Sequence, residues 1–330
     1  MAGRIIVTGG AGFIGSNIVR ALNARGRDDV LVVDRLGRDA KWRNLLGTTV
    51  TDVLHKDTFR RLIRDDALGD DVTAVIHMGA CSATTETDAD YLLDNNTRYT
   101  RELCAWCLRH DVRFIYASSA ATYGDGRRGY DDDPARLPDL RPLNMYGFSK
   151  HLFDLWAWRE GLLDRIVGLK FFNVYGPGED HKGEMRSVIH KAYGQILEHG
   201  RVRLFRSYRP EYPDGGQVRD FVFVDDAVAV TLFFLDHPEL GGIYNCGTGK
   251  ARTWLDLARG VFAAMGREPE IEFIDMPPEL RDRYQYHTEA DLARLRAAGY
   301  DRPFTELEDG IRAYVERHLG HPDGPFGGRR

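Results

Sequence analysis

The sequence predicts an α/β protein in which a doubly wound parallel sheet is followed by a smaller C-terminal α/β domain. Three observations lead to this prediction. Short apolar runs alternate with helix-length amphipathic segments, a glycine-rich turn separates the first run from the first helix, and glycine and proline become frequent after about Asn173. Strands that are apolar on both faces and separated by helices are typical of a parallel sheet covered on both sides.

The expected elements follow in chain order. The strands expected in the sheet are residues 4–8, 30–34, 73–77, 113–117 and 165–171, and the helices between them are 12–25, 57–67 and 90–110. Later, 220–224 and 242–245 are expected to return to this sheet, and 254–266 and 289–298 have the pattern of helices. The expected domains are 1–172 joined by 220–245, then 173–219 with 246–320, and finally a loose tail at 321–330.

The composition is that of an ordinary globular protein. The 330 residues carry a net charge of −5 that is spread along the chain, which argues against nucleic acid as a partner. No apolar run reaches the roughly 18 residues of a membrane span, and no secretory signal precedes the first strand. We therefore expect a cytoplasmic protein without membrane contact. Cys104 and Cys107 form one isolated C-x-x-C in a helix-like run, which favours helix-face residues over a metal or redox site.

The glycine-rich turn has the spacing of a dinucleotide-binding motif. Gly9 permits the tight turn after the first strand, Gly12 lets the backbone approach a pyrophosphate, and Gly15 lets helix and strand pack closely. The phosphates then lie at the positive end of the helix. Asp34 ends the second strand 19 residues after Gly15, where a carboxylate can bind the adenosine ribose. The first domain is therefore predicted to be a Rossmann domain that binds a nicotinamide dinucleotide.

The basic residues after Asp34 favour NADP over NAD. Asp34 alone is typical of NAD, because a lone carboxylate repels a 2′-phosphate. Arg35, Lys41 and Lys56, however, lie near enough in sequence to gather around that phosphate, and so does Arg38. The alternative is that these are solvated surface charges and that the cofactor is NAD.

A tyrosine and a lysine have the spacing of a catalytic pair. Tyr146 and Lys150 form a Y-x-x-x-K that places both side chains on one face of a helix. The lysine ammonium and a positive nicotinamide favour the phenolate and lower the tyrosine pKa from its usual value of about 10. Ser119 follows the strand expected at 113–117 and offers a hydroxyl at the carboxyl edge of the sheet, where open parallel sheets bind ligands.

Together these motifs resemble the extended short-chain dehydrogenases/reductases that act on nucleotide sugars. The resemblance covers nearly the whole chain to about residue 318, and within that group it is greatest to the epimerases that act at C6 of an ADP-bound heptose. The stretches that carry it are GACSATTE at 79–86, DNN at 94–96, FNVYGP at 172–177, HKG at 181–183, RDFV at 219–222 and RYQ at 283–285. The chain departs from the pattern in an enlarged loop at 208–218 and in Arg35, where relatives have an asparagine.

The resemblance implies a reaction. C6 of the D-glycero sugar is oxidised by tightly bound NADP, and return of the hydride to the other face gives the L-glycero epimer, a precursor for the lipopolysaccharide core. Tyr146 and Lys182 are the implied acid/bases on the two faces, Ser119 hydrogen-bonds the oxygen at C6, and Lys150 holds the ribose and tunes Tyr146. The resemblance also implies a homo-oligomer, with a pentamer as the suggested size.

The resemblance also implies which residues bind the two ligands. The implied cofactor-binding residues are Gly9, Gly12, Phe13, Ile14, Gly15, Asp34, Arg35, Lys41, Lys56, Met78, Gly79, Ala80, Cys81, Ser82, Asn95, Lys150, Val174 and Lys182. The implied substrate-binding residues are Asn173, Glu184, His190, Phe205, Arg219 and Tyr284.

Three alternatives make different demands on the sequence. A 4,6-dehydratase needs an acid and a base after the strand-end serine, where this chain has Ala120 and Ala121. A nucleotide-sugar 4-epimerase shares the serine, tyrosine and lysine but leaves Lys182 without a role. A non-catalytic dinucleotide sensor would not need the serine, tyrosine and lysine at all. The acidic and histidine residues between 179 and 190 lack the fixed spacing of a metal site, so no metal is expected.

Overall fold

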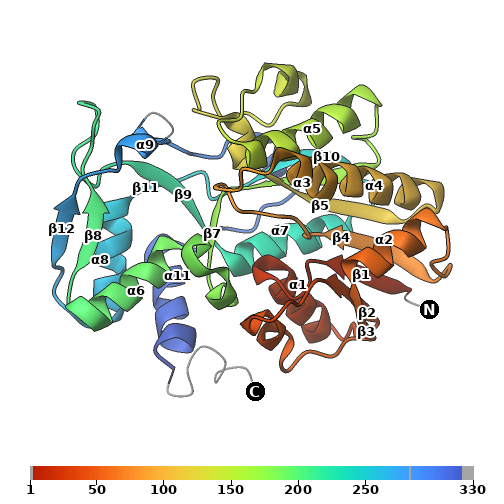
Figure 1. Ribbon diagram of the computed structural model, residues 1–330, viewed down its shortest axis with the longest axis horizontal. Helices are drawn as coiled ribbons and strands as arrows, with labels where there is room; N and C mark the ends of the chain where they lie inside the picture. Colours follow the sequence, from red (N-terminus) through yellow and green to blue (C-terminus); the bar gives the residue numbers. More distant parts are fainter. Residues whose placement is uncertain (1–2, 282–283, 322–330) are drawn as a thin grey trace.

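A seven-stranded parallel sheet forms the centre of the computed structural model, which describes residues 3–281 and 284–321 (Figure 1). Its strand order is β10-β6-β5-β4-β1-β2-β3. The chain begins with β1 in the middle of the sheet and adds β2 and β3 on one side. It then crosses β1 and adds β4, β5, β6 and β10 in turn on the other side. This reversal lies between β1 and β4, where doubly wound sheets bind their ligands. The strands are β1 (Arg4–Thr8), β2 (Val30–Asp34), β3 (Asp52–His55), β4 (Val72–His77), β5 (Arg113–Ser119), β6 (Ile166–Phe171) and β10 (Gly242–Cys246).

Helices cover both faces of this sheet. One face carries α1 and α7, which pack against each other, and the other carries α2, α4 and α5. The interior between these layers is apolar, and Ile6, Val75 and Ile115 of the strands are fully buried. Cys104 and Cys107 lie in the same core as free thiols. The helices are α1 (Phe13–Ala24), α2 (Lys56–Arg64), α4 (Tyr99–Arg109), α5 (Met145–Arg159) and α7 (Val224–Asp236).

The predicted doubly wound sheet is confirmed, with two local differences. The five strands expected in the first half are present to within two residues of their predicted bounds. β3 was not expected, because it is a four-residue edge strand with exposed ends and lacks an apolar run. The expected helix at 90–110 is divided into α3 (Ala89–Leu92), a π-helical turn η2 (Leu93–Arg98) and α4.

The later strands divide between sheets, which corrects one expectation. β10 returns to the main sheet beside β6, as predicted for 242–245. The strand predicted at 220–224 does not, because β10 occupies the place next to β6. That strand is β9, which pairs with β7 and β11 in a separate three-stranded sheet. The bounds are β7 (Asn173–Tyr175), β9 (Val218–Phe223) and β11 (Ala251–Thr253).

The remaining elements form a layer beside the carboxyl edge of the main sheet (Figure 1). A two-stranded sheet of β8 and β12 and the packed helices α6, α8 and α11 make up most of it. No helix within the described residues is long and apolar enough to cross a membrane. The tail predicted at 321–330 lies outside the described residues except for His321. The elements are β8 (Val202–Phe205), β12 (Ile271–Ile274), α6 (Val188–His199), α8 (Trp254–Ala264), α9 (Pro278–Arg281), α10 (Ala293–Ala297), α11 (Leu307–Tyr314) and the π-helical turn η6 (Val315–Leu319).

Candidate active site

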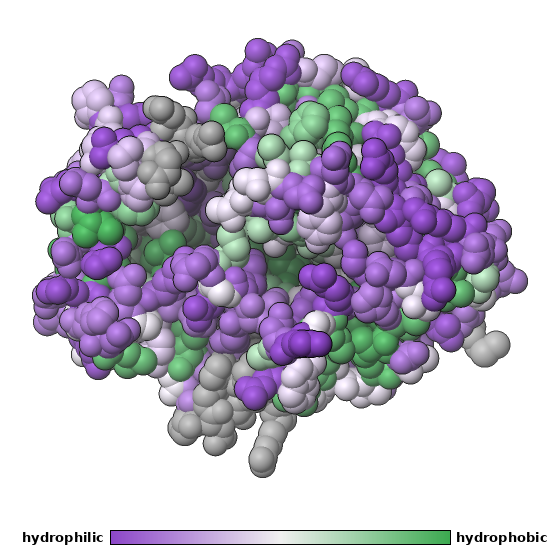
Figure 2. Space-filling view, viewed as in Figure 1, coloured by the Kyte–Doolittle hydropathy of each residue, from purple (hydrophilic) through white to green (hydrophobic). Residues whose placement is uncertain are grey.

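A cavity of about 600 Å³ opens at the carboxyl ends of β1, β2, β4 and β5. Its opposite wall comes from β7 and from η5 (Asp180–Met185) with the residues that follow it. In Figure 2 the surface is hollowed near the middle of the view, and hydrophobic side chains line the hollow beneath a mostly hydrophilic surface. The predicted site residues that line the cavity are Gly9, Gly12, Phe13, Ile14, Gly15, Asp34, Arg35, Lys41, Lys56, Met78, Gly79, Ala80, Ser82, Asn95, Ser119, Tyr146, Lys150, Asn173, Val174 and Lys182.

The glycine-rich turn is too crowded for larger residues. A Cβ at Gly15 would lie 2.1 Å from the carbonyl oxygen of Gly9, and one at Gly9 would lie 2.7 Å from the backbone nitrogen of Gly79. Gly9 also has a φ of 65°, which favours glycine. α1 begins after Gly12 with no side-chain cap, so its first N–H groups face the cavity free to bind phosphate oxygens. The turn therefore fits a dinucleotide pyrophosphate.

The adenosine end of the cavity combines one buried carboxylate with several cations. Asp34 accepts hydrogen bonds from the backbone N–H of Ala11 (3.0 Å) and from Lys41 Nζ (2.5 Å). Lys56 donates a hydrogen bond to Oδ1 of Asn95 (2.9 Å) rather than to Asp34. Arg35 is exposed at the cavity edge, and no described residue forms an ion pair with it. The charge of Asp34 is thus neutralised locally, while that of Arg35 is not.

The predicted serine, tyrosine and lysine meet at the same wall. Tyr146 and Lys150 lie one turn apart on α5, and Ser119 ends β5 beside them. Burial raises the pKa of Tyr146, and a hydrogen bond with Ser119 partly offsets that effect. Burial also lowers the pKa of Lys150 to about 8, and its Nζ donates to the carbonyl of Ala117 (2.7 Å). In the protein alone the tyrosine pKa is therefore raised, contrary to the expected lowering.

Two buried polar networks support this wall from behind. In the first network, Asn96 of the π-helical turn η2 makes two hydrogen bonds with the backbone of Cys81. Oδ1 of Asn96 accepts from the N–H of Cys81, and Nδ2 of Asn96 donates to the carbonyl of Cys81, each at 2.9 Å. Asn96 also donates to Ser149 Oγ (3.0 Å) on α5. Cys81 itself does not line the cavity. The turn therefore ties the loop after β4 to the helix that carries Tyr146.

The second network lies under the end of β5. Asp154, one turn beyond Lys150 on α5, accepts hydrogen bonds from the hydroxyls of Tyr116 (2.9 Å) and Ser118 (2.6 Å). Its Oδ2 lies 3.7 Å from Nζ of Lys170, and both side chains are almost completely buried. Because a buried charge needs a partner, this pair holds the strand end and the helix in one arrangement.

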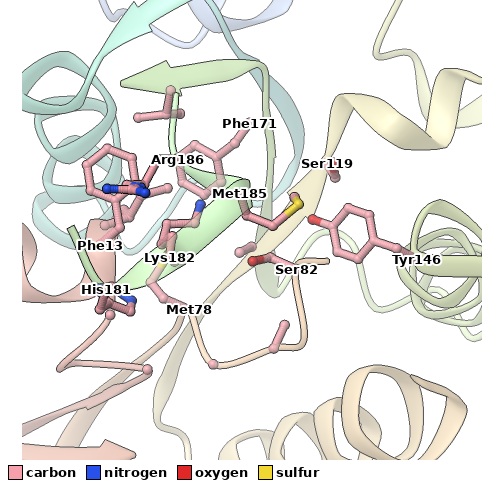
Figure 3. A pocket seen from close by; sticks show the side chains of 18 of the residues that line it. Phe13, Met78, Ser82, Ser119, Tyr146, Phe171, His181, Lys182, Met185 and Arg186 are labelled. Carbon is pink, nitrogen blue, oxygen red and sulfur yellow. The ribbon is translucent and has the colours of Figure 1, made fainter. Parts of the chain in front are cut away.

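Lys182 enters the cavity from the opposite side. Figure 3 shows it facing the wall that carries Tyr146, with Met185 between the two. Its ammonium lies 5.5 Å from the Phe13 ring, and burial lowers its pKa. The cavity therefore has one titratable side chain suited to proton transfer on each side.

The predicted substrate residues are only partly gathered. Arg219 is buried between the rings of Trp254 (5.5 Å) and Tyr284 (5.1 Å), and its Nη1 donates to the carbonyl of Val218 (2.8 Å). Among the described residues no carboxylate pairs with this guanidinium, and burial lowers its pKa. Phe205 packs edge-on against Tyr284. Together these side chains form an aromatic and cationic cluster around Trp254. Trp254 lines the cavity, whereas Arg219, Phe205 and Tyr284 are not among its lining residues.

Two predicted substrate residues point elsewhere. Glu184 is highly exposed and contacts Lys191 (3.2 Å), and His190 contacts Asp180 (3.2 Å). Neither lines the cavity. Asn96, Asp154, Asp180, Met185 and Trp254 were not predicted as site residues. The sequence around Trp254 predicted only a helix. The other residues acquire their roles through contacts with residues that are distant in sequence.

Comparison with known proteins gives consistent results. The model of the NAD dependent epimerase/dehydratase family matches residues 5–247. The chain is 58% identical over 321 residues to an ADP-L-glycero-D-manno-heptose-6-epimerase of Nitratidesulfovibrio vulgaris, covering 97% of this chain and 99% of that protein. It is 47% identical to a protein of the same name from Fusobacterium nucleatum, again covering 97% and 99%.

Solved structures with the same fold include two epimerases. An ADP-L-glycero-D-manno-heptose-6-epimerase of Helicobacter pylori has a TM-score of 0.78 at 26% identity, covering 95% of both chains. A UDP-glucose 4-epimerase of Thermus thermophilus, in complex with NAD, has a TM-score of 0.74 at 30% identity, covering 95% of this chain and 98% of that one.

Proposed function

The chain belongs to the NAD dependent epimerase/dehydratase family, and we propose that it inverts C6 of ADP-D-glycero-D-manno-heptose to give the L-glycero epimer. The observation that carries this proposal is the pair of proton-transfer groups, Tyr146 and Lys182, on opposite sides of one cavity that also holds a dinucleotide-binding turn. The high identity to heptose epimerases over nearly the whole chain supports the same substrate. The product is a precursor of the lipopolysaccharide core.

Held by the glycine-rich turn around Gly9 and Gly15, a nicotinamide dinucleotide would supply the hydride chemistry at C6, as acceptor from one face and donor to the other. Tyr146 takes the proton of the C6 hydroxyl in one orientation of the sugar, and Ser119 hydrogen-bonds the C6 oxygen. Lys150 holds the ribose, and its charge with that of the oxidised nicotinamide offsets the burial that raises the pKa of Tyr146. C6 is exocyclic, so rotation about one bond presents its other face.

Lys182 is the acid/base for that second face. Burial lowers its pKa, which brings an ammonium closer to the range in which it gives up a proton at neutral pH. Arg219 binds the pyrophosphate of the substrate, because a buried guanidinium that has no carboxylate partner in the described part of the chain is a ready site for phosphate oxygens. Phe205, Tyr284 and Asn173 complete the sugar-nucleotide site.

The proposed cofactor is NADP, one per subunit. Lys41 neutralises Asp34, and Arg35 stands at the same edge of the cavity without an ion-pair partner among the described residues, so a 2′-phosphate meets net positive charge there. Binding of NADP and NAD to parent and Arg35→Ala protein tests this. We expect Arg35→Ala to weaken NADP binding and leave NAD binding nearly unchanged. A parent protein that prefers NAD contradicts the proposal.

Proton NMR of purified protein with ADP-D-glycero-D-manno-heptose tests the reaction itself. We expect resonances of the L-glycero epimer to appear without net oxidation, and with little solvent deuterium at C6 in heavy water, because the same hydride leaves and returns. Inversion at C4 of a UDP-hexose, with no change in the heptose, would favour the 4-epimerase alternative instead. We also infer that the protein is a cytoplasmic homo-oligomer. Light scattering tests this inference, and we expect the mass of a pentamer.

A further inference from the structure

Few contacts hold the side chain of the candidate base Lys182. Within the described part of the chain its ammonium makes no hydrogen bond and no ion pair, and it contacts only the face of Phe13 at 5.5 Å among aromatic rings. The residue lies in η5, a short 3-10 segment whose backbone is kinked at Gly183 (φ 54°). A long, freely rotating side chain of this kind is placed only as well as its backbone is placed.

The residues that precede Lys182 at the start of η5 make contacts with different parts of the fold. Glu179 accepts hydrogen bonds from the backbone N–H (2.5 Å) and the hydroxyl (2.6 Å) of Ser187, at the start of α6. His181 contacts the side chain of Asn44 (3.2 Å), in the segment next to the adenosine end of the cavity. These two contacts fix the loop to α6 and to the sheet domain.

Asp180 makes the third and longest-range attachment. Its Oδ1 lies 3.2 Å from Nε2 of His190 in α6, and its Oδ2 lies 3.1 Å from Nε2 of His318 in η6. Tyr314 lies beside both imidazole rings. Burial raises the pKa of Asp180, but the hydrogen bonds from the two histidines outweigh it and hold that pKa well below its usual range. The ionised carboxylate therefore joins three segments of the chain.

We propose that Asp180, held between His190 and His318, is a positioning residue that sets where Lys182 stands relative to the sugar carbon. The C-terminal turn η6 thereby contributes to catalysis without touching substrate. This inference rests on the proposed function, in which Lys182 serves one face of C6. Tyr146 belongs to α5 on the other side of the cavity (Figure 3), whereas the contacts of Asp180 are to α6 and η6. Loss of Asp180 should therefore weaken only the step that uses Lys182.

An aldehyde analogue separates the two faces. The probe is ADP-mannose oxidised to the aldehyde at C6 and carrying deuterium there. In protein loaded with reduced NADP, hydride adds to C6 while Tyr146 or Lys182 transfers a proton to the oxygen, which gives a primary alcohol and oxidised NADP. The alcohol carries one hydrogen and one deuterium, and their arrangement depends on which face received the hydride. Proton NMR of the product after one turnover therefore reports which base acted.

We expect Lys182→Met to give one C6 epimer of the deuterated alcohol and Tyr146→Phe to give the other. Asp180→Ala should lower the Lys182-dependent rate by about 10-fold or more, because small displacements of a catalytic group are costly, and change the other rate less than about twofold. His318→Gln keeps an N–H that can donate to Asp180, so it should retain more of the Lys182-dependent product than His318→Leu does. Glu239→Gln removes an exposed acid–histidine contact outside the cavity and is the matched control.

The outcomes separate the two proposals. An unchanged product ratio in Asp180→Ala, where Lys182→Met does shift it, overturns the positioning role. An equal fall in the rates of formation of both epimers also overturns it, because Asp180 would then only support folding. If Lys182→Met itself leaves the ratio unchanged, the two-base function fails and the inference falls with it.

Discussion

Replacing Asp154 by alanine should lower the free energy of unfolding substantially. The carboxylate is fully buried, lies 3.7 Å from Nζ of Lys170, and accepts hydrogen bonds from Tyr116 and Ser118. Its removal leaves the ammonium uncompensated, which costs at least about 3 kcal/mol in a site of this kind. The two hydroxyls lose their acceptor as well, and Lys170 keeps its hydrogen bond to the hydroxyl of Thr122 (2.7 Å).

Urea unfolding followed by circular dichroism measures this loss. Combining Asp154→Asn with Lys170→Met removes both charges and keeps an acceptor for the hydroxyls, so this double variant should lie within about 2 kcal/mol of the parent. Asp236→Ala, which breaks an exposed pair with Arg25, should cost less than about 1 kcal/mol. If Asp154→Ala costs no more than that control, or if the double variant is as unstable as Asp154→Ala, the buried pair does not act as described.

Three further predictions concern binding, pH and thiol reactivity. Gly15→Ala should abolish dinucleotide binding in a calorimetric titration, because the new Cβ meets the Gly9 carbonyl at 2.1 Å; an unchanged Kd would contradict the turn geometry. Burial lowers the pKa of Lys150 from 10.5 to about 8, so the unfolded chain binds more protons between these values and the parent gains stability as pH rises through them. Lys150→Met should therefore be more stable than the parent by up to about 3 kcal/mol at pH 7, and thermal melts should show that gain fading towards pH 10.5. Burial raises the pKa of Cys104 to about 12, so this thiol should react with an alkylating reagent only after unfolding; rapid labelling of folded protein would refute its burial.

The dinucleotide half of the site could be predicted from sequence because its signals are local. Gly9, Gly12 and Gly15 encode a turn within one stretch of chain, and Asp34 follows at the end of the next strand. The spacing of Tyr146 and Lys150 likewise encodes one face of α5. In each case strand and helix periodicity alone places the side chains at the carboxyl edge of the sheet.

The other half could not be predicted in this way because its contacts are between distant residues. Asp180 and His318 are 138 positions apart, and only the packing of the turn η6 against α6 brings them together. The same holds for β9, whose apolar pattern suited the main sheet but whose partners are β7 and β11. His190 was expected to bind substrate, and only the folded loop shows that Asp180 occupies its ring nitrogen.

The π-helical turn η2 has a consequence for the length of the chain. A π-helical turn takes up about one residue more than an α-helical turn, so the helix after it is rotated by roughly 100° relative to a regular continuation. Deleting one residue from Leu93–Arg98 would let α3 and α4 merge into a single regular helix with a better internal hydrogen-bond pattern. It would also swing Asn95 away from the cavity or Asn96 away from the backbone of Cys81. The contact between Asn96 and Cys81 therefore depends on the number of residues in this segment, and a homologue with a one-residue gap here would need another way to hold the loop at Cys81.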